Sequence, residues 1–143
     1  FGSRIGFEMD CRVDAEQVLL PTFTLQPLVE NAVIHGISPK EEGGRIRIRI
    51  REKAGNIVLT VTDSGQGMPP DRRRALLEGT GGHRGHVSGI GISNVKTRLQ
   101  MLYPGARMDI FSRVGLGTAI RIAFPANHQL EGLADVYHCD SRR

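Results

Sequence analysis

The stretch NIVLTVTDSGQGM, residues 56–68, passes from an alternating strand directly into a glycine-rich turn. Successive side chains of a strand point to opposite faces, so Ile57, Leu59 and Val61 predict one apolar face. Asp63 continues the same alternation and therefore lies on that face. A carboxylate on a covered face is costly unless a hydrogen-bond donor compensates it. The stretch thus predicts a strand that ends in a buried acceptor.

Asp63 has two interpretations at the level of sequence. In the first, the carboxylate accepts a hydrogen bond from a flat ligand, because Gly65 and Gly67 follow it and leave space for one. An adenine amino group is a suitable donor, whereas guanine would present a second acceptor at a cost of about 1–3 kcal/mol. In the second, an Asp-Ser-Gly turn forms and Asp63 caps backbone groups.

The rest of the chain surrounds this strand with further strands and amphipathic helices. Apolar periodicity predicts strands over about 4–13, 44–53, 56–62, 107–113 and 117–124, and helices from 22–24 to 36, over 70–77 and over 92–102. The fold class is therefore α/β, a two-layer sandwich in which about three helices cover one face of a mixed sheet. We expect one domain over 5–125, with a glycine-rich lid over about 68–90, and a tail or linker over 126–143.

Composition restricts the function classes. The 143 residues suffice for one domain, and no apolar run approaches the roughly 20 residues of a membrane helix, so we expect this chain not to contact a membrane. Two cysteines are too few for a disulfide scaffold or a zinc cluster. The net charge is +4, but four arginines alternate with isoleucines over 45–51 without interleaved aromatic residues. This pattern indicates a solvated sheet face, and we expect no nucleic-acid binding.

A second motif is the glycine-rich segment over 79–91. It ends where a helix is predicted to begin, and bare N–H groups at a helix N-terminus suit phosphate groups. Its length and polarity are typical of a lid that closes over a nucleotide. A surface loop without function is the alternative.

The first predicted helix holds a third motif. Asn31 and His35 are four residues apart and share a face, with Glu30 one position round. The amide oxygen of Asn31 is a suitable ligand for Mg²⁺, and Glu30 could accept a proton or orient a nucleophile. The alternatives are a structural buried asparagine and a solvated glutamate. Farther along, Thr118 places a hydroxyl on the apolar face of its strand, where it needs a partner.

Four segments in this order resemble the motifs of the histidine-kinase ATP-binding domain. LQPLVENAVIHG resembles its N box, DSGQGM its first glycine box, SGIGISNVKTRL its second, and GLGTAIRIAFP its closing strand. The superfamily has the Bergerat ATPase fold and includes DNA gyrase and heat-shock chaperones. The forms of the N box and of the second glycine box are similar to the LytS-type branch of sensor kinases.

The resemblance implies roles for matched positions. Asn31 would hold Mg²⁺ against the phosphates of ATP, Asp63 would read adenine, and Thr118 would support an adenine-bound water. His35 would lie near the phosphates, with Glu30 as the acidic neighbour. The two glycine boxes would supply the remaining nucleotide contacts, namely Gly65, Gly67 and Met68 at the base and Ser88, Gly89, Ile90, Gly91 and Ile92 at the phosphates.

The chain also departs from the family's pattern. Ile34 stands where histidine kinases often carry a lysine, and Pro27 stands where gyrase-type enzymes carry their catalytic glutamate. No segment resembles the phosphoacceptor helix. We therefore expect the fragment to bind ATP without phosphorylating itself.

For the parent protein the resemblance implies a protein-histidine kinase. It would be a homodimer that transfers the γ-phosphoryl group to a histidine on a separate dimerisation domain and then to a response regulator. The kinase would be anchored in the inner membrane, with this domain in the cytoplasm. Two alternatives remain open: a degenerate nucleotide-sensing module, and a serine kinase of the anti-sigma-factor type.

Overall fold

A computed structural model describes residues 4–14, 18–21, 24–79, 87–126 and 136–138. The elements of the first half of the chain are β1 (Ile5–Cys11), β2 (Leu19–Pro21), α1 (Leu25–Glu30), the π-helix η3 (Asn31–Ile37), β3 (Gly44–Lys53) and β4 (Asn56–Asp63). The remaining elements are α2 (Pro70–Glu78), α3 (Val87–Leu102), β5 (Arg107–Arg113), β6 (Gly117–Pro125) and β7 (Val136–His138).

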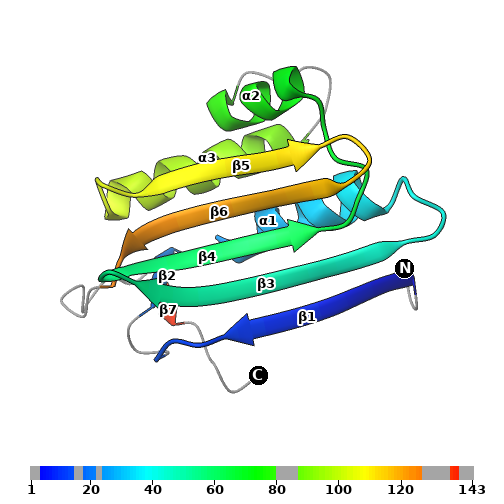
Figure 1. Ribbon diagram of the computed structural model, residues 1–143. Coiled ribbons are helices and arrows are strands. Elements are labelled where there is room, and N and C mark those ends of the chain that lie inside the picture. Colours follow the sequence, from blue (N-terminus) through cyan, green and yellow to red (C-terminus); the bar gives the residue numbers. More distant parts are fainter. Residues whose placement is uncertain (1–3, 15–17, 22–23, 80–86, 127–135, 139–143) are drawn as a thin grey trace.

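The main sheet has five strands in the order β1-β3-β4-β6-β5. Strands β1 and β3 are parallel, and the other neighbouring pairs are antiparallel. The helices lie on one side of this sheet, and α2 projects beyond the β5 edge (Figure 1). The prediction of a two-layer α/β sandwich with a mixed sheet covered on one face is confirmed.

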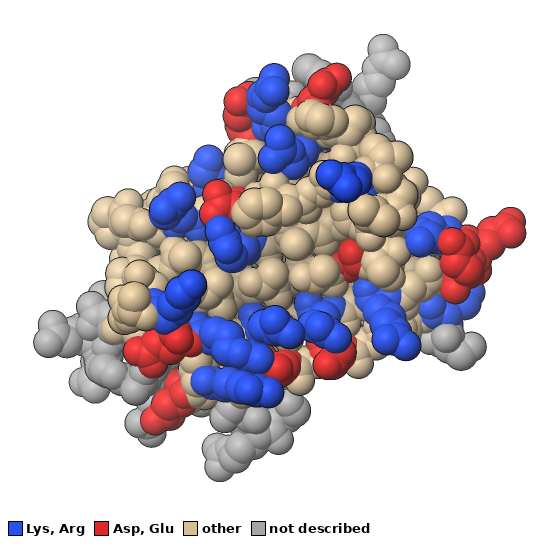
Figure 2. Space-filling model, viewed as in Figure 1, with Lys and Arg blue, Asp and Glu red and all other residues tan. Residues whose placement is uncertain are grey.

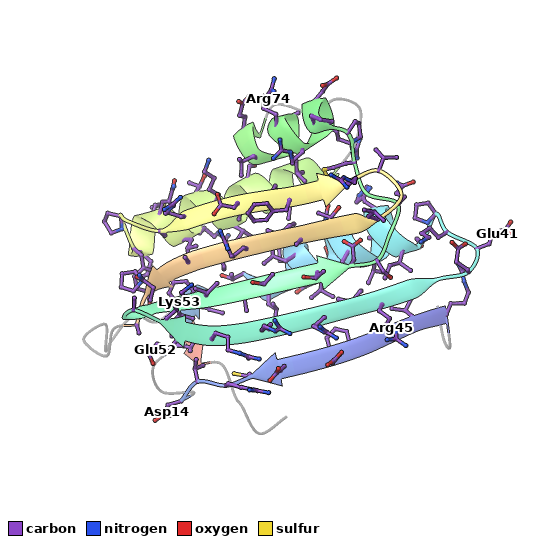
Figure 3. All side chains as sticks on the ribbon, viewed as in Figure 1. Asp14, Glu41, Arg45, Glu52, Lys53 and Arg74 are labelled. Carbon is purple, nitrogen blue, oxygen red and sulfur yellow. The ribbon has the colours of Figure 1, made fainter. Side chains whose placement is uncertain are left out.

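The alternation of β3 separates the two faces of the sheet. Ile46, Ile48 and Ile50 are each 1% exposed and lie in the core, because they point toward the helices. The arginines between them point to the open face, where basic side chains are visible along the lower strands (Figure 2) and Arg45 extends outward (Figure 3). The core continues through the helical layer, where Leu28, Ile92 and Leu99 are buried.

Three local features differ from the sequence prediction. The first helix is α-helical only to Glu30 and continues as a π-helix, in which Ser38 N–H donates to Val33 O over 2.9 Å. Helix α3 begins at Val87 rather than at residue 92. The glycines between these positions lower helix propensity, but packing of the helix against the core outweighs that loss.

A third difference lies outside the main sheet. Strand β2 pairs antiparallel with β7, which falls within the predicted tail or linker. Each strand has three residues, too few for alternation to be recognised in sequence. Across the described ranges, no helix combines the length and apolarity that a membrane span requires.

Candidate functional site

Asp63 is the last residue of β4 and is only 5% exposed. Its Oδ1 accepts a hydrogen bond from Gly65 N–H over 2.8 Å, and the backbone of Thr118 on β6, the strand partner of Asp63, also hydrogen-bonds to the carboxylate. A carboxylate has about four acceptor sites, so two backbone donors leave capacity for a ligand. The predicted buried acceptor is therefore present. Asp63 caps the turn through its bond with Gly65 N–H and still has acceptor sites for a ligand.

Glycines surround Asp63 because backbone segments approach it closely. A Cβ at Gly36, near the end of η3, would lie 2.7 Å from Asp63 Oδ1, and one at Gly65 would lie 2.2 Å from the carbonyl carbon of Gly36. Gly117 has φ +124°, and a Cβ there would lie 2.0 Å from Asp63 O. The chain requires glycine at 36, 65 and 117 to close η3, β4 and β6 around one carboxylate.

Gly65 and Gly67 were predicted to leave space for a flat ligand, which stays a prediction, and the structure adds a packing reason for both. Gly65 packs against Gly36. Gly67 has φ +69°, and a Cβ at that position would lie 2.0 Å from Arg113 O. Neighbouring backbone forbids a side chain at both positions.

Burial raises the pKa of Asp63 to about 6. Removal of the carboxylate from water is the largest cause, and it is opposed by the hydrogen bonds from Gly65 and Thr118 and by the positive charge of Lys40. Lys40 also donates to Ser64 O over 3.0 Å. Asp63 is consequently ionised at neutral pH but remains costly to ionise, which favours a ligand that donates a hydrogen bond to it.

Ser112 on β5 fixes the hydroxyl of Thr118. Ser112 Oγ donates to Gly117 O over 3.0 Å, accepts from Met68 N–H over 2.9 Å, and lies 2.8 Å from Thr118 Oγ1. Because the single proton of Ser112 is directed at the carbonyl, Thr118 donates its proton to Ser112. Thr118 Oγ1 then faces the site as an acceptor. The same bonds hold Met68, which is 7% exposed, against the β5–β6 hairpin.

Asn31 begins η3 and is 4% exposed. Among the described residues no buried side-chain nitrogen or oxygen atom lacks a hydrogen-bond partner, so the interpretation of Asn31 as a structural asparagine stays open beside that of a Mg²⁺ ligand. His35 is half-buried one turn later, and Gln66 joins the two motifs by donating from its side chain to His35 O and from its backbone to Gly36 O, both over 2.9 Å.

Glu30 lies apart from Asp63. It is exposed and accepts a hydrogen bond from Gln26 Nε2 over 2.9 Å. It lines a mainly apolar groove of about 470 Å³ between α1 and the β1 edge, together with Phe7, Met9, Leu25, Gln26, Val29 and Ile48. Of these two N-box residues, Glu30 therefore lines this groove, whereas the buried Asn31 does not.

The predicted phosphate contacts fall into two groups, one at the first four N–H groups of α3 and one further inside this helix. The first four N–H groups of a helix lack an intrahelical partner, and in α3 they belong to 87–90, which includes Ser88, Gly89 and Ile90. Gly91 and Ile92 lie within the helix, beyond these first four N–H groups, and their assignment to the phosphates stays a prediction. Ile92 is fully buried in the core, and a Cβ at Gly91 would lie 3.4 Å from Pro27 Cβ. Residues 80–86 of the predicted lid lie outside the described residues.

Sequence reasoning missed Gly36, Lys40 and Ser112. Ser112 could have been found, because the 107–113 and 117–124 hairpin places it directly opposite Thr118. Gly36 and Lys40 had no such signal, since their positions depend on how η3 and its following turn pack against β4.

Comparison with known proteins identifies the family. Residues 19–128 match the model of the histidine kinase-, DNA gyrase B- and HSP90-like ATPases. The chain is 35% identical over 131 residues to the sensor histidine kinase YesM of Bacillus subtilis, covering 91% of this chain and 21% of that protein. It is 30% identical over 137 residues to the sensor protein LytS of the same organism, covering 90% of this chain and 21% of the relative.

A solved structure supports the fold. The catalytic domain of histidine kinase ThkA superposes with a TM-score of 0.63 at 17% identity, covering 86% of this chain and 79% of that one. The chain belongs to the histidine kinase-, DNA gyrase B- and HSP90-like ATPase family. The relatives named above are sensor kinases, and the chain spans about a fifth of their length.

Proposed function

We propose that this domain binds Mg-ATP with adenine at Asp63 and presents the γ-phosphoryl group to a histidine on a separate dimerisation domain. The observation that carries the proposal is the buried carboxylate of Asp63, 5% exposed, held by backbone donors and beside an oriented Thr118. The adenine amino group donates to Asp63. A water bridges adenine to Asp63 and to Thr118 Oγ1, which Ser112 leaves as an acceptor.

The phosphates lie toward Asn31 and the first turn of α3. The N–H groups of 87–90 and the helix dipole stabilise the negative charge, and His35 lies one turn from Asn31. Asn31 would contribute its amide oxygen to Mg²⁺, which would neutralise phosphate charge when bound. No group of three His, Cys, Asp or Glu side chains in the described ranges forms a metal site, and a single oxygen ligand suits an ion that keeps waters and phosphate oxygens.

Transfer takes place where Glu30 is exposed. The imidazole nitrogen of the incoming histidine forms a bond to the γ-phosphorus as the bond to the leaving oxygen of ADP breaks. Glu30, held by Gln26 over 2.9 Å, orients the imidazole or accepts its proton. The parent protein is a homodimer anchored in the inner membrane, with this domain in the cytoplasm, and it passes the phosphoryl group to a response regulator.

The test is a phosphotransfer assay with γ-³²P-ATP. Adding the parent's dimerisation domain should yield acid-labile phosphohistidine on that domain, whereas this chain alone should yield none. Asn31→Ala should abolish the transfer, and Asn94→Ala, at an exposed position of α3, should not. Acid-labile phosphate on the isolated chain, or transfer by Asn31→Ala at the wild-type rate, would contradict the proposal.

A degenerate nucleotide-sensing module is the second candidate, favoured by Ile34. This residue is 53% exposed on η3, where the family often has a lysine. The same assay separates the candidates, since a sensing module binds nucleotide but transfers no phosphate. Acid-stable phosphoserine on a partner would instead indicate the serine-kinase alternative.

A further inference from the structure

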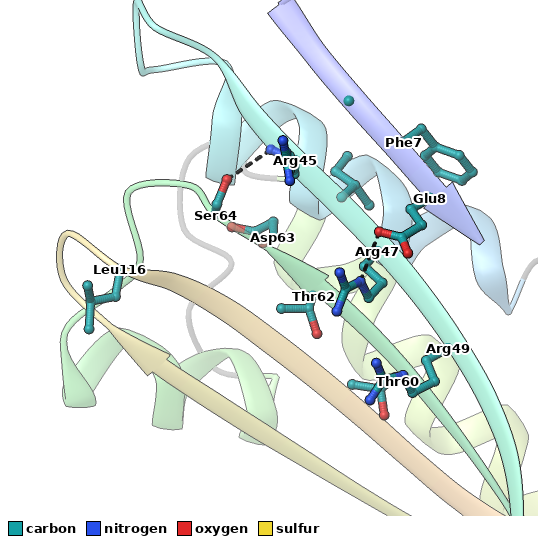
Figure 4. A pocket seen from close by; sticks show the side chains of 12 residues that line it. Phe7, Glu8, Arg45, Arg47, Arg49, Thr60, Thr62, Asp63, Ser64 and Leu116 are labelled. Carbon is teal, nitrogen blue, oxygen red and sulfur yellow. Dashed lines mark hydrogen bonds and ion pairs between the residues drawn. The ribbon is translucent and has the colours of Figure 1, made fainter. Parts of the chain in front are cut away.

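The open face of the sheet carries charge that the proposed function does not use. Arg45, Arg47, Arg49 and Arg51, here called the arginine row, project from alternate positions of β3. Arg45, Arg47 and Arg49 line a hollow of about 550 Å³ on the face opposite the helices, together with Thr60 and Thr62 of β4. Figure 2 shows the basic side chains gathered over the lower strands, and Figure 4 shows the hollow from close by.

Carboxylates of β1 neutralise only alternate members of the row. Glu8 pairs with Arg47 over 3.1 Å, as the dashed line in Figure 4 marks, and Asp10 pairs with Arg51 over 2.5 Å. Both contacts follow from the parallel register of β1 and β3, which places carboxylate-bearing residues beside β3 on the open face.

Arg45 and Arg49 lack such a partner within the described part of the chain. Gly6, which has no side chain, is opposite Arg45. Asp10 is opposite Arg49, but its two oxygens are directed at Arg51 and, over 3.3 Å, at Arg12. Two filled positions therefore alternate with two vacant ones. The filled positions show that guanidinium groups of this row can receive a carboxylate.

The residue type and the neighbours of the vacant positions indicate what fits. Guanidinium groups bind carboxylates through paired hydrogen bonds. A row of positive charges that served solubility alone would not require this hydrogen-bonding geometry. Thr60 and Thr62 add hydroxyl donors, and exposed Leu116 gives the hollow an apolar border. Nucleic acid fits less well, since Phe7 is the one aromatic residue of the lining and its ring lies beyond β1 from the arginines (Figure 4).

We propose that the arginine row is a docking surface for an acidic segment of a partner protein, whose carboxylates pair with Arg45 and Arg49. Neighbouring row positions are about 6.7 Å apart and the two vacant ones about 13 Å apart, so an extended acidic segment laid along β3 reaches both. Asp63 and Ser64 also line the hollow, but the carboxylate of Asp63 is buried on the covered face of the sheet, so docking along β3 does not depend on nucleotide.

The test measures fluorescence anisotropy of a labelled polyglutamate peptide of about ten residues, long enough when extended to cover the row. Binding at about 10 mM salt should weaken at least tenfold in the double variant Arg45→Gln/Arg49→Gln. The matched control, Arg72→Gln/Arg74→Gln, removes the same charge from exposed positions of α2 and should change affinity less than twofold (Figure 3 labels Arg74).

Three outcomes would overturn the proposal. They are the absence of peptide binding, an equal loss in both double variants, which would indicate net charge alone, and tighter, row-dependent binding of an oligothymidylate of equal charge, which would indicate nucleic acid. ADP binding should be unchanged in Arg45→Gln/Arg49→Gln, so failure here and failure of the nucleotide site are distinguishable.

Discussion

The two faces of the sheet hold aspartates with opposite electrostatics. On the covered face, burial raises the pKa of Asp63 to about 6. On the open face, the hydrogen bond from Arg51 holds the pKa of Asp10 below its usual value. The same residue type, placed in a strand of the same sheet, is thus a costly ion on one face and a well-compensated one on the other. Burial, rather than the presence of a carboxylate, distinguishes the site from the surface.

The largest expected effect concerns the backbone contacts that make the burial possible. Gly65→Ala should lower the free energy of unfolding by about 3 kcal/mol, because its Cβ would lie 2.2–2.4 Å from backbone atoms of Gly36. Gly105→Ala is the control, since no atom lies within 4 Å of that position, and it should change stability by less than about 0.5 kcal/mol. Equal urea midpoints for the two variants would show that η3 and β4 separate easily.

The pH dependence of stability should differ in sign between the two aspartates. Asp63 binds its proton more tightly folded than unfolded, so wild-type stability falls as pH rises from about 4 to 6, by on the order of 1–3 kcal/mol. Asp10 has the reverse shift, so its contribution is present above pH 4 and is lost at lower pH. Urea unfolding of Asp63→Asn should lack the decline between pH 4 and 6, whereas Asp10→Asn should keep it.

Nucleotide binding should follow the ionisation of Asp63. Adenine donates to the carboxylate, so the dissociation constant for ADP should rise as pH falls through about 6, and binding should be about tenfold weaker at pH 5 than at pH 8. Calorimetric titration at several pH values measures this. A flat profile, or a profile that Asp63→Asn shares with the wild type, would assign the dependence to another group.

The smallest effect tests the orientation of Thr118. Ser112→Ala removes the acceptor of the Thr118 proton, so ADP affinity should fall about fivefold, the equivalent of one neutral hydrogen bond of about 1 kcal/mol. Thr62→Ala, an exposed hydroxyl on the open face of β4, is the matched change and should leave affinity within twofold. If Thr62→Ala weakens ADP binding as much as Ser112→Ala does, the loss of a hydroxyl lowers ADP affinity through the stability of the fold. That outcome would contradict the role of Ser112 in orienting Thr118.

The alternation of β3 and β4 was sufficient to predict the sheet, its covered face and the burial of Asp63, because period-two patterns determine which side chains meet the helices. Contacts between distant segments were not predictable in this way. The π-helical turn of η3, the start of α3 at Val87 and the β2–β7 pair depend on tertiary packing that outweighs local propensity. The packing role of Gly65 was not predicted either, because it depends on contact with Gly36, which is 29 residues away in sequence.

The most direct measurement is calorimetric titration of ADP and GDP against the wild type, Asp63→Asn and Asp10→Asn. The wild type and Asp10→Asn should bind ADP at least tenfold more tightly than GDP, because guanine presents a carbonyl oxygen to a carboxylate. Asp63→Asn should lose at least tenfold in ADP affinity and lose the discrimination. Equal affinities for the two nucleotides in the wild type, or unchanged ADP binding in Asp63→Asn, would contradict the assignment of Asp63 as the group that reads adenine.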